Sequence, residues 1–265
     1  MRICTVIKQV PDSNATIKVL ADGSGIDLAS VKLVPDPFDE MGVELAIQLR
    51  EKGRDVSEIV ALTLGPDKAG EVLRTALAMG ADKGVHINDD KLVSNNEVFS
   101  AFVVAEAIKK DAEGFDLVIC GKQTIDLDAG TFGPALAEFL GWPHVGAVTA
   151  LDFSDDGKRF TARRRIEGAE EVVECDLPAL LTVEKGLVEA RYPSLPNLMK
   201  AKKKPVIVLT SADIPGEDAA EAGTYFDSLS PPPPKPDCTF IEGEPAEMAK
   251  ELVRRLREEA KVVES

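Results

Sequence analysis

Short apolar segments alternate with amphipathic segments over residues 3–140, and this alternation constrains the fold more than any other feature of the sequence. The apolar segments have the length and β-branched content of strands, whereas the amphipathic ones carry apolar residues at helical spacing. Strands joined by helices over short connections run parallel and are covered by helices on both faces. The expected strands are Ile3–Val10, Glu58–Leu64, Lys83–Ile87 and Leu117–Cys120, and the expected helices are Asp39–Lys52, Asp67–Met79, Asn95–Lys110 and Pro134–Leu140.

The ends of these helices carry recognisable signals. Asp39 and Asp67 are placed to cap the first and second helices, and Gly80 is placed to end the second in a left-handed conformation. Because crossovers between parallel strands are right-handed, the carboxyl ends of all the strands meet at one edge of the sheet. Ligands of such folds bind at that edge, so the search for a site begins there.

The pattern changes after Pro143. Three strand-like segments separated by turn residues predict an antiparallel extension, and two apolar strands follow with a loop rich in proline and lysine between them. We expect one α/β domain over residues 1–210, including this extension and the loop 184–204. These later strands are Ala147–Phe153, Arg159–Ile166, Glu170–Cys175, Ala179–Val183 and Val206–Leu209.

Residues 211–265 are predicted to form a C-terminal arm. The run Pro231–Pro234 favours an extended polyproline spacer, and Pro245–Val262 has the pattern of a charged amphipathic helix. The apolar stripe of this helix has no evident place in the α/β domain. It either lies on a partner subunit or docks on its own domain, and the pattern favours neither.

Charge and composition exclude several classes of function. The net charge of −15 disfavours binding to nucleic acids and to anionic membranes, so any anion must be held locally. No apolar run is long enough for a membrane span. His86 and His144 lack neighbours at metal-ligand spacing, which argues against a metal site.

The cysteines and the N-terminus bear on the compartment. The four cysteines form no C-x-x-C pair, and Cys4 and Cys120 lie in apolar, strand-like runs as core residues. The first residues lead directly into a strand-like run without a signal-peptide pattern. We therefore expect reduced thiols and a cytoplasmic location.

The segment Cys120–Pro134 is the most informative stretch for a ligand. It follows a buried strand, opens a helix and contains the small residues Ala129, Gly130 and Gly133. Small residues allow the backbone to approach a ligand, and a helix N-terminus offers free N–H groups to a phosphate. A side chain added at Gly133 is therefore expected to crowd the ligand. The segment indicates a nucleotide site, but a turn needed only for the fold accounts for the pattern equally well.

Three further loops lie at the same predicted edge. They are Lys8–Pro11, Val34–Glu40 and Leu64–Asp67, which together with the first segment are expected to enclose an adenine-sized pocket. No nucleophile and base, activated cysteine or carboxylate pair is evident, so we expect no catalytic residue. Any chemistry then belongs to a bound cofactor.

A basic cluster within residues 183–204 is a local exception to the acidic charge. Leu195 lies between Ser194 and Pro196, where a loop holds an apolar side chain outward. Leu195 beside Leu198 and Met199, with lysines to attract an acidic partner, favours a protein-recognition surface. The alternative is an ordinary charged loop.

Three motifs resemble the β subunits of electron-transfer flavoproteins. They are Arg191–Lys204, Leu73–Gly84 and the run Gly121-Lys122-Gln123-Thr124-Ile125-Asp126-x-Asp128. The resemblance extends in register from the first strand to Lys204 and more loosely over the C-terminal segment.

This resemblance implies a Rossmann-like fold of the adenine-nucleotide-binding type. It also implies a heterodimer with an α subunit, which mainly binds the electron-carrying FAD. Phe38 is implied to face that flavin as well, and Leu195, with Arg191 and Lys200, to form the surface that docks partner dehydrogenases. The C-terminal arm is implied to wrap the α subunit. The nucleotide-contacting positions implied for this chain are Val6, Lys8, Asp36, Phe38, Leu64, Asp126, Asp128, Ala129, Gly130, Thr131, Phe132 and Gly133.

Two branches of the family differ in the nucleotide of the β subunit. One branch holds a structural AMP and has a Gln-Thr-Gly-Gln-like sequence where this chain has Thr131-Phe132-Gly133-Pro134. The other holds a second FAD, which takes an electron pair from NADH and divides it between two acceptors, and has an apolar residue followed by Gly-Pro, as here. An apolar side chain in place of a hydroxyl removes one phosphate hydrogen bond, worth roughly 1–2 kcal/mol.

The resemblance to the second branch has exceptions. Thr131 stands where that branch usually has Gln, and Asp36 replaces a common Asn. The sequence thus favours the second FAD and electron bifurcation, with NADH as donor and with ferredoxin or flavodoxin among the acceptors. A non-bifurcating carrier with AMP is the alternative. In both cases an acyl-CoA-type or other dehydrogenase is expected as a partner.

Two other classes share this type of fold. A nucleotide-sensing module without redox activity is a remote alternative that a colourless protein would support. An adenylating enzyme needs a Ser-Gly-Gly-type loop after the first strand, which the residues following Lys8 do not provide.

Overall fold

The computed structural model describes residues 1–216, 227–235 and 237–263. The chain divides into two compact units, Met1–Leu229 and Ser230–Ser265. The first unit extends beyond the boundary expected at residue 210. The 3₁₀ turn η4 (Ser211–Asp213) leads to Ile214, which is buried in the core, and Asp213 pairs with Lys110 at 2.6 Å.

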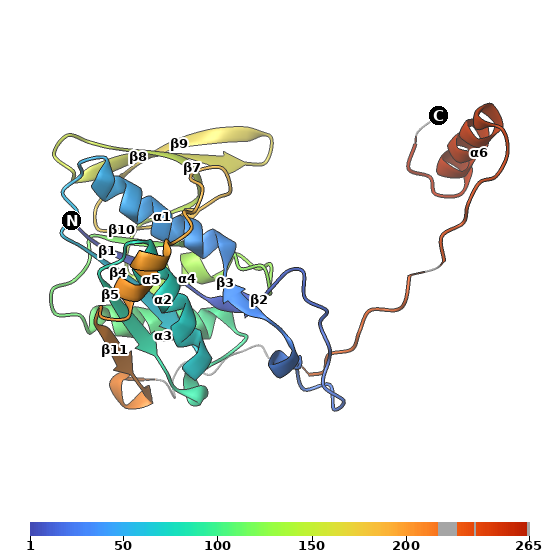
Figure 1. Ribbon diagram of the computed structural model, residues 1–265. Helices are drawn as coiled ribbons and strands as arrows, with labels where there is room; N and C mark the ends of the chain where they lie inside the picture. The colour runs from blue at the N-terminus through green and yellow to red at the C-terminus, as the bar shows by residue number, and fades with distance from the viewer. Residues whose placement is uncertain (217–226, 236, 264–265) are drawn as a thin grey trace. The chain divides into compact units, whose positions relative to one another are not determined.

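One mixed sheet of nine strands organises the first unit (Figure 1). Its spatial order is β11-β5-β4-β1-β6-β10-β7-β8-β9. The strands are β1 (Arg2–Val6), β4 (Glu58–Leu64), β5 (Lys83–Ile87), β6 (Leu117–Gly121), β7 (His144–Phe153), β8 (Arg159–Ile166), β9 (Ala169–Asp176), β10 (Ala179–Val183) and β11 (Val206–Leu209).

The pairing agrees with the expected α/β class. The strands from β11 to β7 are all parallel, and β8 and β9 continue the sheet as an antiparallel hairpin. The segment expected as the first antiparallel strand is β7, which pairs parallel with β10 on one side and antiparallel with β8 on the other. It begins at His144 rather than at Ala147 because residues 144 and 145 already pair with β10.

Helices cover both faces of the sheet. The helices α1 (Pro37–Glu51) and α2 (Gly70–Met79) contribute to one core cluster, and α3 (Glu97–Lys109) and α4 (Phe132–Leu140) contribute to the other. Alternate residues of β1 serve the two faces, with Ile3 in the first cluster and Cys4 in the second. Burial of Cys4 and Cys120 confirms both as core residues.

The first expected strand is interrupted. β1 ends at Val6, and the next residues form β2 (Gln9–Pro11), which pairs with β3 (Leu33–Pro35) in a separate small sheet. The Lys8 N–H donates to Asp39 Oδ2 at 2.8 Å instead of to a neighbouring strand. The prediction of a continuous strand over Ile3–Val10 was therefore wrong, because the Asp39 carboxylate of α1 accepts the Lys8 N–H that a continuous strand would donate to its neighbour.

The helix caps differ in detail from those expected. Asp36, not Asp39, caps α1, since its Oδ1 accepts the Phe38 N–H at 2.9 Å. Asp67 begins the 3₁₀ turn η2 (Asp67–Ala69), after which α2 begins at Gly70. Gly80 ends α2 with a φ of 154°, outside the left-handed helical region that was expected.

The loop rich in proline and lysine contains a helix that the pattern did not reveal. Helix α5 (Leu195–Ala201) begins after Ser194, whose hydroxyl accepts the Asn197 N–H at 3.4 Å, and it anchors to the core through buried Ala201. The prolines at 193 and 196 obscured it in the sequence, although proline is tolerated in a first helical turn.

The second unit contains α6 (Pro245–Glu258), none of whose side chains is buried. Arg254 and Arg255 pair with Glu251 within the helix at 2.8 and 2.9 Å. Pro231–Pro234 belong to no helix or strand.

Two further 3₁₀ turns lie in the first unit, η1 (Leu28–Ser30) and η3 (Asp90–Leu92). Among the described helices, none has the length and apolar character needed to cross a membrane.

Candidate nucleotide site

A cavity of about 1190 Å³ lies in the first unit at the carboxyl ends of the central parallel strands. Residues that follow β1, β4, β5 and β6 line it, including Lys8, Gly65, Asn88 and Lys122. The chain reverses its direction of strand addition here, since β4 and β6 flank β1 on opposite sides. Such a switch point is where open α/β sheets bind ligands. The volume of this cavity slightly exceeds the roughly 300–1000 Å³ of typical small-molecule sites.

Two buried carboxylates from the start of α1 hold the floor of this cavity. Asp39 accepts the N–H groups of Lys8 and Gly121, each at 2.8 Å, and so joins the ends of β1 and β6. Asp36 accepts the Ile125 N–H at 2.7 Å in addition to capping α1. Burial raises the pKa of Asp39 well above its usual range, and the adjacent charge of Asp36 adds to this rise. Two backbone donors, the N–H groups of Gly121 and Ile125, thus fix the end of β6 and the loop after it on the helix.

Ion pairs hold two of the cavity's lysines. Lys8 Nζ lies 2.7 Å from Asp126 Oδ2, and Lys122 Nζ lies 2.6 Å from Glu184 Oε2. Burial opposes ionisation of Glu184, but the hydrogen bonds from Lys122 and from the Lys185 N–H, with the charge of Lys122, together lower the pKa of that carboxyl. Both ammonium groups line or border the space where a nucleotide phosphate or ribose is expected.

Polar groups of the cavity suit a nucleotide. Thr124 lines the cavity, and its hydroxyl oxygen is buried without a hydrogen-bond partner among the described residues. Lys8 and Lys122 supply cations, whereas Val6, Leu64 and Phe132 supply apolar surface for a base or a ring. The residues present therefore fit an adenine nucleotide, which would bring its own redox chemistry if it carries a flavin.

Some of the predicted nucleotide-contacting residues line the cavity, and the others do not. Val6, Lys8, Leu64, Asp126 and Phe132 line the cavity. Asp36 does not line the cavity; it is fully buried and accepts the Ile125 N–H. The other predicted positions do not line the cavity either: Phe38, Asp128, Ala129, Gly130, Thr131 and Gly133.

Gly133 has a structural neighbour that the sequence did not reveal. A Cβ atom added at Gly133 would lie 2.3 Å from Thr182 Cγ2 on β10. The glycine is therefore required where α4 packs against the sheet, whereas the sequence pattern attributed it to the approach of a ligand.

Sequence reasoning missed two parts of the cavity wall. One is the segment after β5, including Asn88, Ser94 and Glu97, and the other is the segment Gly25–Leu33. The rule that strand ends meet at one edge also applies to β5 and could have identified the first part. No local signal marks the second, because it reaches the cavity only through the chain's tertiary path.

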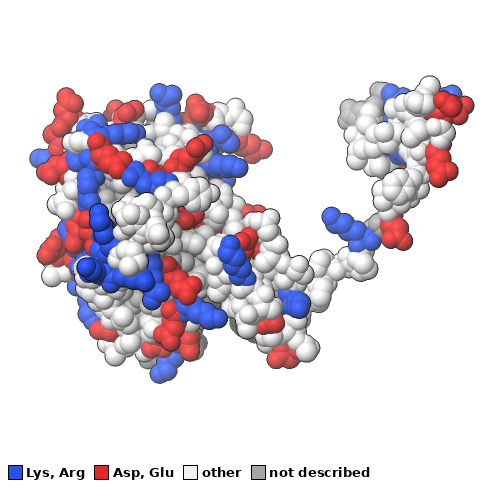
Figure 2. Space-filling view, in the orientation of Figure 1, with Lys and Arg blue, Asp and Glu red and all other residues white. Residues whose placement is uncertain are grey.

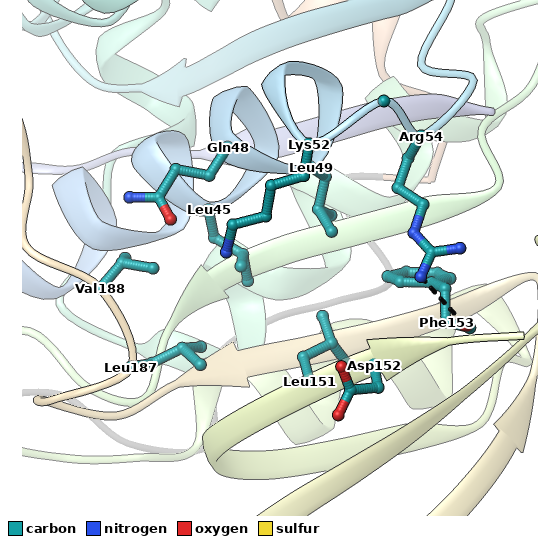
Figure 3. A pocket seen from close by; sticks show the side chains of 11 residues that line it. Leu45, Gln48, Leu49, Lys52, Arg54, Leu151, Asp152, Phe153, Leu187 and Val188 are labelled. Carbon is teal, nitrogen blue, oxygen red and sulfur yellow. Dashed lines mark hydrogen bonds between the residues drawn. The ribbon is translucent and has the colours of Figure 1, made fainter.

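A second, smaller cavity of about 240 Å³ lies beside the end of α1 (Figure 3). Side chains from the last turns of α1 face Leu151 and Asp152 of β7, and Arg54 donates to the Phe153 carbonyl at 3.0 Å. Its volume is below the range of about 300–1000 Å³ usual for small-molecule sites. It lies away from the carboxyl ends of β1, β4, β5 and β6 and is not a candidate for the nucleotide.

The surface of α5 combines exposed apolar side chains with lysines. Leu195 is 73% exposed and Met199 is 58% exposed. Figure 2 shows basic side chains gathered over the region of α5, where Lys200 and Lys202 are exposed.

Arg191, which the resemblance groups with Leu195 and Lys200 in the docking surface, pairs with carboxylates of α1. Its guanidinium donates to Glu44 and to Glu51 of α1, with closest distances of 2.7 Å to each, and Glu44 is buried. These bonds attach the segment before α5 to the body of the domain.

The described residues show no arrangement typical of metal binding. No group of three or more His, Cys, Asp or Glu side chains in that part of the chain is placed to hold a metal ion. The arrangement at the strand edge can bind and orient a nucleotide through its lysines, its threonine and its apolar wall.

Comparison with known proteins assigns this chain to a family. A family model described as the electron transfer flavoprotein domain matches residues 25–214. The electron transfer flavoprotein subunit beta of Bacillus subtilis is 38% identical over 265 residues, covering 99% of this chain and 100% of the relative. That of Bradyrhizobium diazoefficiens is 41% identical over 215 residues, covering 80% and 83%, and that of Sus scrofa is 36% identical over 260 residues, covering 97% of each.

The family-model match includes the strands from β3 to β11 and the α5 segment, whereas β1, β2 and the loop Lys8–Pro11 precede it and are covered by the alignment to the relative from Bacillus subtilis. With relatives above 30% identity aligned over most of both chains, the chain belongs to the electron transfer flavoprotein family, as one of its β subunits.

Proposed function

We propose that this chain pairs with an electron transfer flavoprotein α subunit and carries electrons between dehydrogenases and an acceptor. The observation that carries the proposal is the nucleotide-sized cavity at the switch point of a chain with this family membership. The electron-carrying FAD is held mainly by the α subunit. The chain's own residues bind and orient a second nucleotide in the cavity, at Val6, Lys8, Leu64, Asp126 and Phe132.

The second nucleotide is proposed to be FAD, with NADH as electron donor and bifurcation to two acceptors, one of them ferredoxin or flavodoxin. Two observations favour FAD over a structural AMP. The cavity volume of about 1190 Å³ suits a dinucleotide. Phe132 presents an apolar side chain to the cavity where a hydroxyl would serve an AMP phosphate. The buried, unpaired thiols of Cys4 and Cys120 are compatible with the cytoplasm, where we place this carrier.

The nucleotide content of the purified pair tests this proposal. Boiling the pair and quantifying what is released should yield two FAD and no AMP per pair. One FAD and one AMP would exclude bifurcation and leave the ordinary carrier. A colourless preparation without any adenine nucleotide would contradict the proposal as a whole.

The α5 surface is proposed to dock the partner dehydrogenase. Leu195→Ala removes the most exposed aliphatic anchor of α5, and we expect the rate of flavin reduction at limiting dehydrogenase to fall roughly tenfold, as for an interface hot spot. Flavin content should stay unchanged, because Leu195 does not line the cavity.

Val172→Ala provides a matched control, since Val172 is 64% exposed on β9 at the far edge of the sheet. It should leave the rate unaltered. Equal rates for Leu195→Ala and the unmodified pair would remove α5 from the docking surface.

The C-terminal unit is proposed to wrap the α subunit. Helix α6 carries the apolar side chains of Met248, Leu252 and Val253 at helical spacing, and none of them is buried. A partner surface is the natural cover for such a stripe.

A further inference from the structure

The first turn of α4 offers few free backbone donors. Pro134 has no N–H, and the Ala135 N–H donates to the Thr131 carbonyl at 3.0 Å. Thr131, Phe132 and Gly133 therefore carry the N–H groups available to an anion at this end of the helix. This is the place where the sequence pattern predicted a nucleotide phosphate.

A carboxylate of the same chain already occupies two of these donors. Glu97 Oε2 accepts the Thr131 N–H at 2.9 Å and the Phe132 N–H at 3.1 Å. Glu97 is the first residue of α3, and Asn96 caps that helix independently by accepting the N–H groups of Val98 and Phe99. Glu97 is thus not needed as the cap of its own helix, and its carboxylate instead caps the first turn of α4.

Glu97 and Phe132 both line the cavity, whereas Thr131 and Gly133 do not, so a phosphate that reached the Phe132 N–H from the cavity would meet the charge of Glu97. The surroundings offer little compensation. Of the described residues that line the cavity, three are lysines and six carry carboxylates. Two of these lysines, Lys8 and Lys122, already pair with carboxylates.

We propose that Glu97 determines which nucleotides the cavity accepts, by competing with a phosphate for the N–H group of Phe132 at the cavity wall. The inference rests on the proposed nucleotide site. A phosphate monoester such as that of AMP carries close to two negative charges at neutral pH, whereas each phosphorus of a dinucleotide's pyrophosphate carries one. Repulsion by Glu97 therefore acts most strongly against the monoester, and the site prefers a dinucleotide such as FAD.

Affinity measurements on the full-length chain, freed of resident nucleotide, test this role. Isothermal titrations at neutral pH would use adenosine, AMP and FAD as probes. Glu97→Gln keeps the size of the side chain and removes the charge, and charge-assisted hydrogen bonds are about twice as strong as neutral ones. We expect AMP to bind at least about tenfold more tightly to Glu97→Gln than to the unmodified chain, which corresponds to about 1.4 kcal/mol.

The comparison among probes separates this role from a structural one. Adenosine has no phosphate, so its affinity should change less than about twofold, and the gain for FAD should be smaller than that for AMP. Asp90→Asn is the matched control, since Asp90 lines the same cavity and caps no donor of α4. It should raise AMP affinity far less than Glu97→Gln.

Other outcomes overturn the proposal in distinguishable ways. An equal gain for adenosine and AMP, or no gain for AMP, would leave the nucleotide site standing and remove Glu97 from its selectivity. Weaker AMP binding by Glu97→Gln would make Glu97 a ligand-holding group instead. If neither protein binds adenosine, AMP or FAD, both this role and the proposed function fail.

Discussion

Asp39→Ala is expected to lower the free energy of unfolding by about 2–4 kcal/mol, because it leaves one buried and one partly buried backbone donor without an acceptor, and an unsatisfied buried donor costs about 1–3 kcal/mol. The donors are the N–H groups of Lys8 and Gly121, which end β1 and β6. Release of the buried charge offsets part of this loss, since burial raises the pKa of Asp39. Chemical denaturation followed by circular dichroism measures the change.

Two further variants sharpen the result. Asp39→Asn keeps one acceptor oxygen and should lose less stability than Asp39→Ala. Asp156→Ala removes a carboxylate that also accepts a backbone N–H, from Lys158 at 3.1 Å, but in an exposed turn. It should cost less than about 1 kcal/mol, because water replaces the lost acceptor. Equal losses for Asp39→Ala and Asp156→Ala would show that Asp39 does not join the two strands.

Gly133→Ala is expected to lower the free energy of unfolding by about 1–3 kcal/mol, the usual cost of overpacking a core. The new Cβ would lie 2.3 Å from Thr182 Cγ2 in the fully buried strand β10. Thr182 cannot rotate freely to make room, because its hydroxyl accepts the Ala147 N–H at 2.9 Å.

Thr182→Ser offers a direct rescue of this variant. Serine removes the Cγ2 atom and keeps the hydroxyl that Ala147 requires. The next neighbours of the added Cβ lie at 3.7 Å, which is an ordinary contact distance. Gly133→Ala combined with Thr182→Ser should therefore be more stable than Gly133→Ala alone, and a double-mutant cycle of unfolding free energies measures the coupling. A double variant as unstable as the two losses added together would contradict this account of Gly133.

Local patterns in the sequence predicted much of the architecture. The bounds expected for β4, β5, β8, β10 and β11 agree with the structure. Strand runs and helical stripes are encoded by residues close in sequence, so periodicity alone identifies them. The rule that parallel strands share an edge then located the cavity, and the motifs of the chain had already indicated the family that the comparisons show.

The sequence patterns did not predict helix α5 or the bonds that Arg191 forms with residues far away in the chain. The sequence predicts a loop where α5 lies, because Pro193 and Pro196 are typical of loops, although Pro196 lies in the first helical turn, where proline is tolerated, and Pro193 precedes the helix. Arg191 was assigned to recognition by resemblance, and the structure adds its bonds to Glu44 and Glu51, more than a hundred residues away.

The sequence by itself determined that this chain forms a largely parallel sheet, that helices cover both its faces, and that the loops after the parallel strands meet at one edge. Only the tertiary structure decided which side chains meet there. The order of the strands brings Thr182 against Gly133 and brings Glu97 to the start of α4. Periodicity reports which face of an element is apolar, but the partner of each side chain depends on strand order and register, which are set by the packing of the whole domain.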